Sequence, residues 1–252
     1  MQSTNVESTF YYPENWQKGN WKFAAEYMGD QYSYLVYKRI MDIVTSVLVI
    51  VLLFPLLLPI LALLIKLDSR GPVFFRQKRV GFLGKAFWCY KFRTMRLNDH
   101  ADTRRASRND PRVTRVGWFL RNTCLDELPQ FINVLLGHMS VVGPRPHMLK
   151  DSKEFSDLVS NYAFRNMARP GITGLSQIRG YRGPANNLES VFRRYRWDAY
   201  YVRNVSFLLD LRIMAETGLL MFTSLFNKNK PIPMDDSVYK KVSTPARIKK
   251  IA

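Results

Sequence analysis

The chain has 252 residues and a formal net charge of +18, from 38 Lys and Arg residues against 20 Asp and Glu residues. This length allows one core of ordinary size together with a membrane element and tails. So large a positive charge indicates anionic partners such as nucleic acid, acidic lipid headgroups or phosphorylated substrates. The two cysteines, Cys89 and Cys124, are too few for a disulfide framework or a zinc site, which favours reducing, cytosolic surroundings.

The first candidate element is a membrane segment. Residues 1–37 are polar and aromatic-rich and show no signal-peptide pattern, whereas residues 47–65 are all apolar or proline, long enough to span a bilayer. Pro55 and Pro59 interrupt this apolar run, and each removes a helical hydrogen bond. Basic residues flank both ends, as expected for a segment that enters and leaves on the cytosolic side. A re-entrant helix over residues 38–66 and a kinked single span both fit this pattern.

A β-hairpin is predicted next. Residues 73–80 and 86–92 have strand-like composition and are joined by a glycine-containing turn at residues 81–84. The hairpin and its surroundings hold far more Lys and Arg than Asp and Glu, so we expect a basic surface beside the membrane. Residues 97–112 are polar and end in Asn-Asp-Pro, which predicts a loop.

A helix is expected to begin around residues 127–129 and to end at Gly137, because proline is tolerated in the first turn and glycine favours helix ends. Its apolar residues are predicted to form one core-facing side: Leu125, Leu128, Ile132, Leu135 and Leu136. The later elements are expected in this order: a turn at residues 169–174, a helix at 188–202, a core or interfacial segment at 207–226 and a basic flexible tail at 228–252.

One acidic pair, Asp126-Glu127, stands out in this basic chain. At a helix start, free backbone N–H groups favour anions, although adjacent carboxylates also serve as simple helix caps. Carboxylate oxygens suit Mg²⁺, which bridges protein carboxylates to substrate phosphates, and an aspartate can itself attack phosphorus. Arg145 has limited backbone freedom between Pro144 and Pro146, and its guanidinium matches phosphate oxygens; an ordinary surface turn is the alternative.

Other residues give weaker signals. Lys91 and Arg93 alternate with apolar residues on the predicted second strand, as phosphate-binding side chains or as an ordinary solvated strand face. His147 has no partner pattern and is expected to be structural. The sequence contains no Walker-type loop, no dinucleotide-binding glycine pattern and no serine-hydrolase elbow, which disfavours kinases, Rossmann dehydrogenases and serine hydrolases.

In this order, the elements resemble the bacterial sugar transferase family, the monotopic phosphoglycosyl transferases that start cell-surface polysaccharide assembly. The resemblance covers about residues 38–226. One departure is Phe54, which stands before the first proline where the family often has serine. The resemblance rests on seven ordered motifs: Lys38-Arg39 with the Pro-broken run, Phe75-Arg-Gln-Lys-Arg-Val-Gly81, Tyr90-Lys-Phe-Arg-Thr-Met95, Asn109-Asp-Pro-Arg-Val-Thr114, Leu125-Asp-Glu-Leu-Pro-Gln130, Ser140-Val-Val-Gly-Pro-Arg-Pro146 and Arg169-Pro-Gly-Ile-Thr-Gly174.

The resemblance implies an activity: transfer of a sugar 1-phosphate from a UDP-sugar to polyprenyl (undecaprenyl) phosphate, with release of UMP, as the first membrane step of polysaccharide assembly. It implies Asp126 as covalent nucleophile and Glu127 as its partner, both acting with Mg²⁺, or Mn²⁺ in its place. The region 177–183 is most similar to enzymes that use UDP-glucose, with UDP-galactose next. The implied substrate-binding residues are all basic: Arg145, Lys91, Arg93 and Arg76.

The implied fold class is α+β and mainly helical, with a Pro-broken re-entrant membrane helix kinked at Pro55 and Pro59, a short β-hairpin and a helical cytosolic catalytic domain. The implied location is the cytosolic face of the bacterial inner membrane. Expected partners are membrane lipids and the later glycosyltransferases of the pathway, with no nucleic acid. The expected division is an N-terminal polar segment at 1–37, the re-entrant helix at 38–66, the catalytic domain at 67–227 and the tail at 228–252.

A membrane-tethered nucleic-acid-binding protein is the competing prediction, favoured by the charge and by aromatic residues among arginines. A membrane-bound scaffold without catalysis is a further alternative. Neither explains the Asp126-Glu127 pair or the arginine between two prolines.

Overall fold

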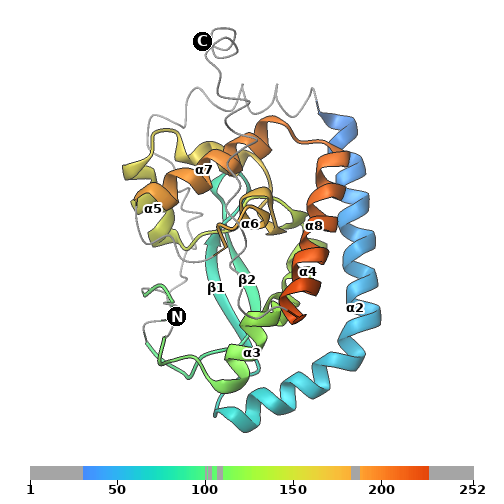
Figure 1. Cartoon of the computed structure of the whole chain (residues 1–252), viewed down its shortest axis with the longest axis vertical. Coiled ribbons are helices and arrows are strands. Elements are labelled where there is room, and N and C mark those ends of the chain that lie inside the picture. The colour runs from blue at the N-terminus through green and yellow to red at the C-terminus, as the bar shows by residue number, and fades with distance from the viewer. Residues whose placement is uncertain (1–30, 100, 102–103, 107–109, 183–187, 227–252) are drawn as a thin grey trace, which may run out of the picture.

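The computed structural model describes residues 31–99, 101, 104–106, 110–182 and 188–226. The predicted tail at 228–252 and most of the predicted segment 1–37 lie outside the described residues. In Figure 1 a long N-terminal helix runs along one side of a body made of shorter helices and two small sheets. The α-helices are α2 (Tyr32–Asp68), α3 (Arg115–Thr123), α4 (Gln130–Leu135), α5 (Leu149–Leu158), α6 (Leu175–Ile178), α7 (Leu188–Arg203) and α8 (Phe207–Phe226).

Helix α2 has 37 residues and continues as one helix through Pro55 and Pro59. Figure 1 shows its axis bending in the cyan part, as expected where proline removes a backbone hydrogen bond and crowds the preceding turn. Among the described helices it alone is long and apolar enough to cross a membrane, by length and composition. Many of its apolar side chains are exposed, such as Val51 at 62% and Leu56 at 64%, which indicates association with a membrane.

The N-terminal half of α2 is fixed to the body by buried polar side chains. The Nζ atom of Lys38 donates to the carboxylate of Asp210 on α8 at 2.7 Å and to the carbonyl of Val142 at 2.9 Å. One carboxylate oxygen of Asp42 accepts from the Ser140 hydroxyl and from the Val141 N–H group, each at 2.9 Å. These charges face protein rather than lipid, which is where charged residues in an apolar helix are tolerated.

The C-terminal half of α2 is fixed to the same body by apolar packing and by caps. Leu61 and Ile65 form a buried cluster with Phe92 of the hairpin and Leu120 of α3. The N–H group of Val116 donates to the Asp68 carboxylate at 2.8 Å. Both ends of the long helix therefore contact one body, and its exposed apolar residues lie between and beside these contacts.

Strands β1 (Phe74–Val80) and β2 (Ala86–Phe92) form an antiparallel hairpin in which Phe74 lies opposite Phe92 and Gln77 lies opposite Cys89. The predicted hairpin is confirmed, with bounds that differ by one residue at the start of β1. The connecting turn includes a short 3-10 helix, η2 (Phe82–Gly84).

A second sheet was not predicted. Strand β3 (Ser140–Val142) pairs in parallel with β4 (Gly171–Thr173), so the predicted turn at residues 169–174 is wrong. The reason is close backbone approach: a Cβ atom on Gly171 would lie 2.1 Å from the Gly143 nitrogen. Only glycine allows the two backbones to pair this closely, whereas glycine in a sequence usually indicates a turn.

The predicted core face around α4 is confirmed only in part: Leu125 and Leu128, just before the helix, pack against the cluster of Leu61 and Ile65, but the helix itself buries other residues. The buried residues of this helix are Gln130, Asn133 and Val134, whereas Leu136 is 56% exposed. Asn133 accepts from the backbone N–H group of Tyr90 at 2.9 Å and donates to the Trp88 carbonyl at 2.7 Å. A polar side chain is buried here because it completes the hydrogen bonding of strand β2.

The main hydrophobic core lies between the hairpin turn, β3, α6, α7 and α8. It includes Val142, Met139, Trp197, Tyr201 and Ile213. A smaller aromatic cluster joins α5 and α7 to the 3-10 helix η4 (Tyr162–Met167). The predicted helix at 188–202 is confirmed as α7, and the segment at 207–226 is helix α8, whose Asp210 is fully buried.

Candidate active site

Asp126 and Glu127 lie in a tight 3-10 turn, η3 (Leu125–Glu127), between α3 and α4. Cys124 has a left-handed backbone (φ 58°) that ends α3 and starts this turn. The N–H group of Glu127 donates to the Cys124 carbonyl at 3.1 Å, and that of Leu128 donates to Leu125 at 3.2 Å. The expectation of free helix N–H groups beside the pair is therefore wrong for Glu127 and Leu128, since the turn itself uses them.

Two basic side chains from distant segments converge on this acidic pair. Lys91 of β2 places Nζ 2.6 Å from the Oε1 atom of Glu127 and 3.5 Å from the Oδ2 atom of Asp126. Arg145 donates to both oxygens of Glu127, at 2.7 Å and 3.3 Å. The structure thus brings together four of the predicted site residues, Asp126, Glu127, Lys91 and Arg145.

The pKa values of the two carboxylates are shifted in opposite directions. Burial raises the pKa of Asp126 above its ordinary value of 3.8, and the neighbouring charge of Glu127 adds to this, while Lys91 opposes it. Burial would also raise the pKa of Glu127, but its ion pairs with Arg145 and Lys91 hold that pKa well below the usual range. Paired carboxylates with separated pKa values are typical of sites that assign them separate roles.

The backbone of Arg145 is fixed from two sides. Arg165 of η4 donates from Nη2 to the Arg145 carbonyl at 2.6 Å and forms a buried ion pair with Asp198 at 2.8 Å. The N–H group of Gly171 in β4 donates to the Pro144 carbonyl at 3.0 Å. The Arg145 side chain therefore reaches Glu127 from a rigid segment, which agrees with the restriction expected from its flanking prolines.

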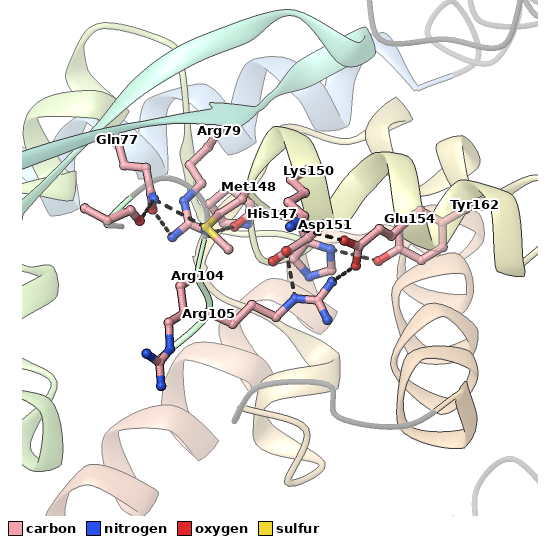
Figure 2. Close-up of polar contacts among 12 residues, drawn as sticks. Gln77, Arg79, Arg104, Arg105, His147, Met148, Lys150, Asp151, Glu154 and Tyr162 are labelled. Atoms are coloured by element: carbon pink, nitrogen blue, oxygen red, sulfur yellow. Dashed lines mark hydrogen bonds and ion pairs between the residues drawn. The ribbon is translucent and has the colours of Figure 1, made fainter. Parts of the chain in front are cut away.

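Figure 2 shows polar contacts around the segment that follows Arg145, including contacts with Gln77 and Arg79 of β1. Arg79 of β1 donates to the Pro146 carbonyl at 3.3 Å and also bonds to Gln77. His147 is buried, and its Nδ1 atom lies 2.8 Å from the Tyr162 hydroxyl. Burial and the nearby arginines lower the pKa of His147, so the ring is neutral and structural, as the sequence predicted.

The other two predicted substrate-binding residues lie elsewhere. Arg93 donates to the carbonyls of Ser69 at 2.6 Å and Arg70 at 2.7 Å, so it caps the end of α2. Arg76 is exposed, with its guanidinium 4.9 Å from the centre of the Trp88 ring. Within the part of the chain that the structure describes, neither side chain bonds to Asp126 or Glu127.

Sequence reasoning did not single out two arginines close to the turn. Arg121 on α3 donates from Nε to the Thr94 hydroxyl at 2.8 Å and is close enough to Asp126 for its charge to be felt there. Arg182 places Nη1 3.9 Å from the Cys124 sulfur. The spacing of Arg121 ahead of the acidic pair could have indicated its position, whereas no local signal connects Arg182 to the turn.

No cluster of three or more His, Cys, Asp or Glu side chains suited to a metal occurs among the described residues. Asp126 and Glu127 nevertheless supply two carboxylates at one point, and Mg²⁺ binds through one or two carboxylates when water and substrate phosphates provide the remaining ligands. The donor set therefore fits Mg²⁺ in the presence of a phosphorylated substrate.

Comparisons with known proteins show the family of the chain. A family model described as bacterial sugar transferase matches residues 33–224. The chain belongs to the bacterial sugar transferase family. Membership favours catalysis over the nucleic-acid-binding and scaffold alternatives. The matched region includes nearly all of α2 and the turn that holds Asp126 and Glu127.

Three relatives illustrate the range of the family. The chain is 46% identical over 196 residues to a Klebsiella pneumoniae UDP-glucose:undecaprenyl-phosphate glucose-1-phosphate transferase, covering 77% of this chain but 41% of that protein. It is 50% identical over 188 residues to the exopolysaccharide production protein PSS of Rhizobium leguminosarum bv. phaseoli, covering 73% of this chain and 94% of that protein. An Aeromonas hydrophila UDP-N-acetylgalactosamine-undecaprenyl-phosphate N-acetylgalactosaminephosphotransferase is 42% identical over 186 residues, or 73% and 43% of the two chains. The chain thus spans about two fifths of the length of two of these relatives.

Proposed function

We propose that the chain transfers a sugar 1-phosphate, namely glucose 1-phosphate, from UDP-glucose to undecaprenyl phosphate and releases UMP. This would be the first membrane step of polysaccharide assembly, with later glycosyltransferases extending the product. The proposal rests on one observation above all: Asp126 is buried beside Glu127, which is held ionised by Lys91 and Arg145. The choice of glucose is supported by the name of the Klebsiella relative.

The proposed reaction has two steps that exchange one phosphorus–oxygen bond for another. An oxygen of Asp126 attacks the phosphorus that bears the sugar; the bond from that phosphorus to UMP breaks, and UMP leaves with the electron pair. An oxygen of undecaprenyl phosphate then attacks the same phosphorus, and the Asp126 carboxylate is released. The raised pKa of Asp126 supports this role, because a more basic carboxylate is a better nucleophile once it is ionised.

The surrounding charges would stabilise the phosphates during both steps. Arg145 and Lys91 are proposed to bind phosphate oxygens, with Glu127 fixing the position of both cations. Asp126 and Glu127 are the residues that would hold Mg²⁺ or Mn²⁺, and such an ion withdraws negative charge from a phosphoryl group. Arg76 and Arg93 remain candidates for substrate binding, although their contacts lie on Trp88 and on the end of α2.

A re-entrant arrangement of α2 is part of the proposal, with the catalytic body on the cytosolic face of the bacterial inner membrane. Its support is that both halves of α2 contact the same body, through Lys38 and Asp42 at one end and Leu61 and Ile65 at the other. A plain span would separate these ends by roughly 30 Å of hydrocarbon. Pro55 and Pro59, inside the exposed part, would place the bend within one leaflet.

The same packing places the acidic turn near the membrane helix. Leu125 and Leu128, on either side of the pair, pack against the cluster that contains Leu61 and Ile65 of α2. A lipid-linked phosphate that approaches along α2 would therefore arrive close to Asp126. This proximity supports a polyprenyl phosphate as acceptor rather than a soluble alcohol or phosphate.

Replacement of Asp126 by Asn tests the reaction. With UDP-glucose, Mg²⁺ and no lipid, the wild-type protein should release at most about one UMP per site, and mass spectrometry should find a hexose phosphate on the peptide that contains Asp126. The Asp126→Asn variant should release no UMP under these conditions. Near-normal turnover of that variant with lipid present would refute a covalent step through Asp126 and favour direct attack by the lipid phosphate.

Topology is tested separately in intact cells, with single cysteines introduced at Gly19 and at Lys230 in a chain in which Cys89 and Cys124 are replaced. A membrane-impermeant thiol reagent should label neither site before the cells are opened and both sites afterwards. Labelling of the Gly19 site in intact cells would instead establish a spanning helix.

A further inference from the structure

Arg182 reaches the turn that holds the acidic pair, although it comes from a segment far along the chain. Its Nη1 atom lies 3.9 Å from the sulfur of Cys124, the left-handed residue whose carbonyl accepts from Glu127. Burial raises the pKa of the Cys124 thiol, so the sulfur is neutral at ordinary pH and does not balance the arginine's charge. A neutral thiol is also a weak hydrogen-bond acceptor for a guanidinium.

Among the described residues, few groups accept hydrogen bonds from Arg182. In the described part of the chain, its contact with Cys124 is its sole side-chain hydrogen bond, and no carboxylate pairs with it. Its Nε atom is buried and has no acceptor among the described residues. By contrast, Lys91 and Arg145 share Glu127, and Arg165 pairs with Asp198. A guanidinium offers five donors in a plane that matches two oxygens of a phosphate.

The charges already present around the acidic pair nearly cancel. The negative charges of Asp126 and Glu127 offset the positive charges of Lys91 and Arg145, so these four residues are close to neutral together. The proposed reaction brings further negative charge to the same place, first on a nucleotide diphosphate and then on a lipid phosphate. An additional cation beside the turn would stabilise those phosphates in a partly buried site.

We infer that Arg182 is a phosphate-binding residue of this site, which holds a substrate phosphate against the Cys124 turn. The inference rests on the proposed function for the identity of the substrate. The phosphate bound by Arg182 could come from either substrate: the diphosphate of the UDP-sugar or the phosphate of the polyprenyl acceptor. Arg182 acts through contact with one of these phosphates rather than through the fold of the turn.

Equilibrium binding in detergent tests this inference without relying on turnover. UDP and a short-chain polyprenyl phosphate are titrated in separate experiments into the wild-type protein and into the variants Arg182→Gln, Arg182→Lys and Arg193→Gln. Arg193 is the matched control, because it removes the same charge from α7, where it pairs with Glu189 at 2.6 Å. Arg182→Gln should weaken binding of one probe by roughly tenfold or more, the loss expected for a charge-assisted hydrogen bond.

The probe that loses affinity identifies the phosphate, and a loss for both assigns Arg182 to a position shared by the two substrates. Arg182→Lys should restore part of the binding, and Arg193→Gln should bind both probes as the wild type does. Unchanged binding of both probes to Arg182→Gln would overturn the inference. Equal losses of affinity in Arg182→Gln and Arg182→Lys, with a lowered melting temperature in each, would also overturn it, because they would indicate a structural role. Failure of the proposed function appears differently, as a wild-type protein that binds the probes but releases no UMP.

Discussion

Replacing Glu127 by Gln should separate the catalytic role of this residue from its structural one. Glu127 accepts hydrogen bonds from Lys91 at 2.6 Å and from Arg145 at 2.7 Å and 3.3 Å. Glutamine keeps the size of the side chain and one acceptor oxygen but removes the charge that holds both cations. The turn itself should remain, because its backbone hydrogen bonds involve Cys124 and Leu125 rather than the side chain.

The expected cost in stability follows from the contacts that are lost. A hydrogen bond between charged partners contributes about 1.5–3 kcal/mol, but the Lys91 and Arg145 side chains are 19% and 28% exposed, so solvent offsets part of the loss. Since glutamine still accepts one bond, we expect a net loss of about 1–3 kcal/mol in the free energy of unfolding. For a chain of this length that corresponds to a fall in melting temperature of about 2–12 °C.

The expected cost in activity is larger. Lys91 and Arg145 would no longer be aligned for the phosphates, and removal of one such preorganised electrostatic contact lowers turnover by about 10²–10³-fold. UMP release is measured for Glu127→Gln beside the control Glu154→Gln, which removes a carboxylate of α5 that pairs with Arg105 and Lys150 outside the site. Turnover of Glu127→Gln within twofold of the wild type would refute the reasoning, as would a melting temperature lowered so far that the variant is unfolded in the assay.

Three further outcomes are expected. Exhaustive chelation should abolish UMP release and added Mg²⁺ should restore it, since two carboxylates must approach a diphosphate; full turnover in chelator would exclude the ion. Activity should rise with pH as Asp126 loses its proton, with a midpoint above the ordinary 3.8 that moves down in Glu127→Gln, because the Glu127 charge raises the pKa of Asp126. A midpoint that stays fixed in that variant would assign the titration to another group. Asn133→Ala should lower the free energy of unfolding by about 1–3 kcal/mol, because the N–H group of Tyr90 and the carbonyl of Trp88, both partly buried, lose their partner; Asn204→Ala, an exposed residue, is the control.

The elements that were predicted correctly are those determined by residues close together in the sequence. The hairpin follows from strand-like residues on both sides of a glycine-containing turn, and β2 begins and ends where predicted. A helix at residues 38–66 was predicted from the apolar run; α2 extends from Tyr32 to Asp68 and bends where Pro55 and Pro59 lie, without a break. The acidic pair and the Pro-flanked Arg145 were recognisable because each motif is contained within a few residues.

The elements that the sequence did not predict depend on contacts between distant segments. β3 and β4 have three residues each and pair across about thirty positions, too short for any alternation of side chains to be detected. The burial of Asn133 depends on the unpaired edge of β2, which no pattern within α4 reveals. Arg93 follows the same alternation as Lys91, yet it caps α2 while Lys91 reaches Glu127. Alternation predicts which face a side chain occupies but not which partner it finds.

The long apolar helix α2 holds together the segments that form the candidate site. Arg39 donates to the carbonyls of Val134 and Leu135 at 2.6 Å and 2.8 Å, at the end of the short helix that follows Glu127. Three residues farther along α2, Asp42 accepts from the Val141 N–H group in β3, the strand that leads to Arg145. One turn of α2 therefore holds both segments whose meeting forms the Glu127–Arg145 pair. Polar residues are retained in an otherwise apolar helix because they are buried against protein at this point, so the geometry of the candidate site depends on helix α2.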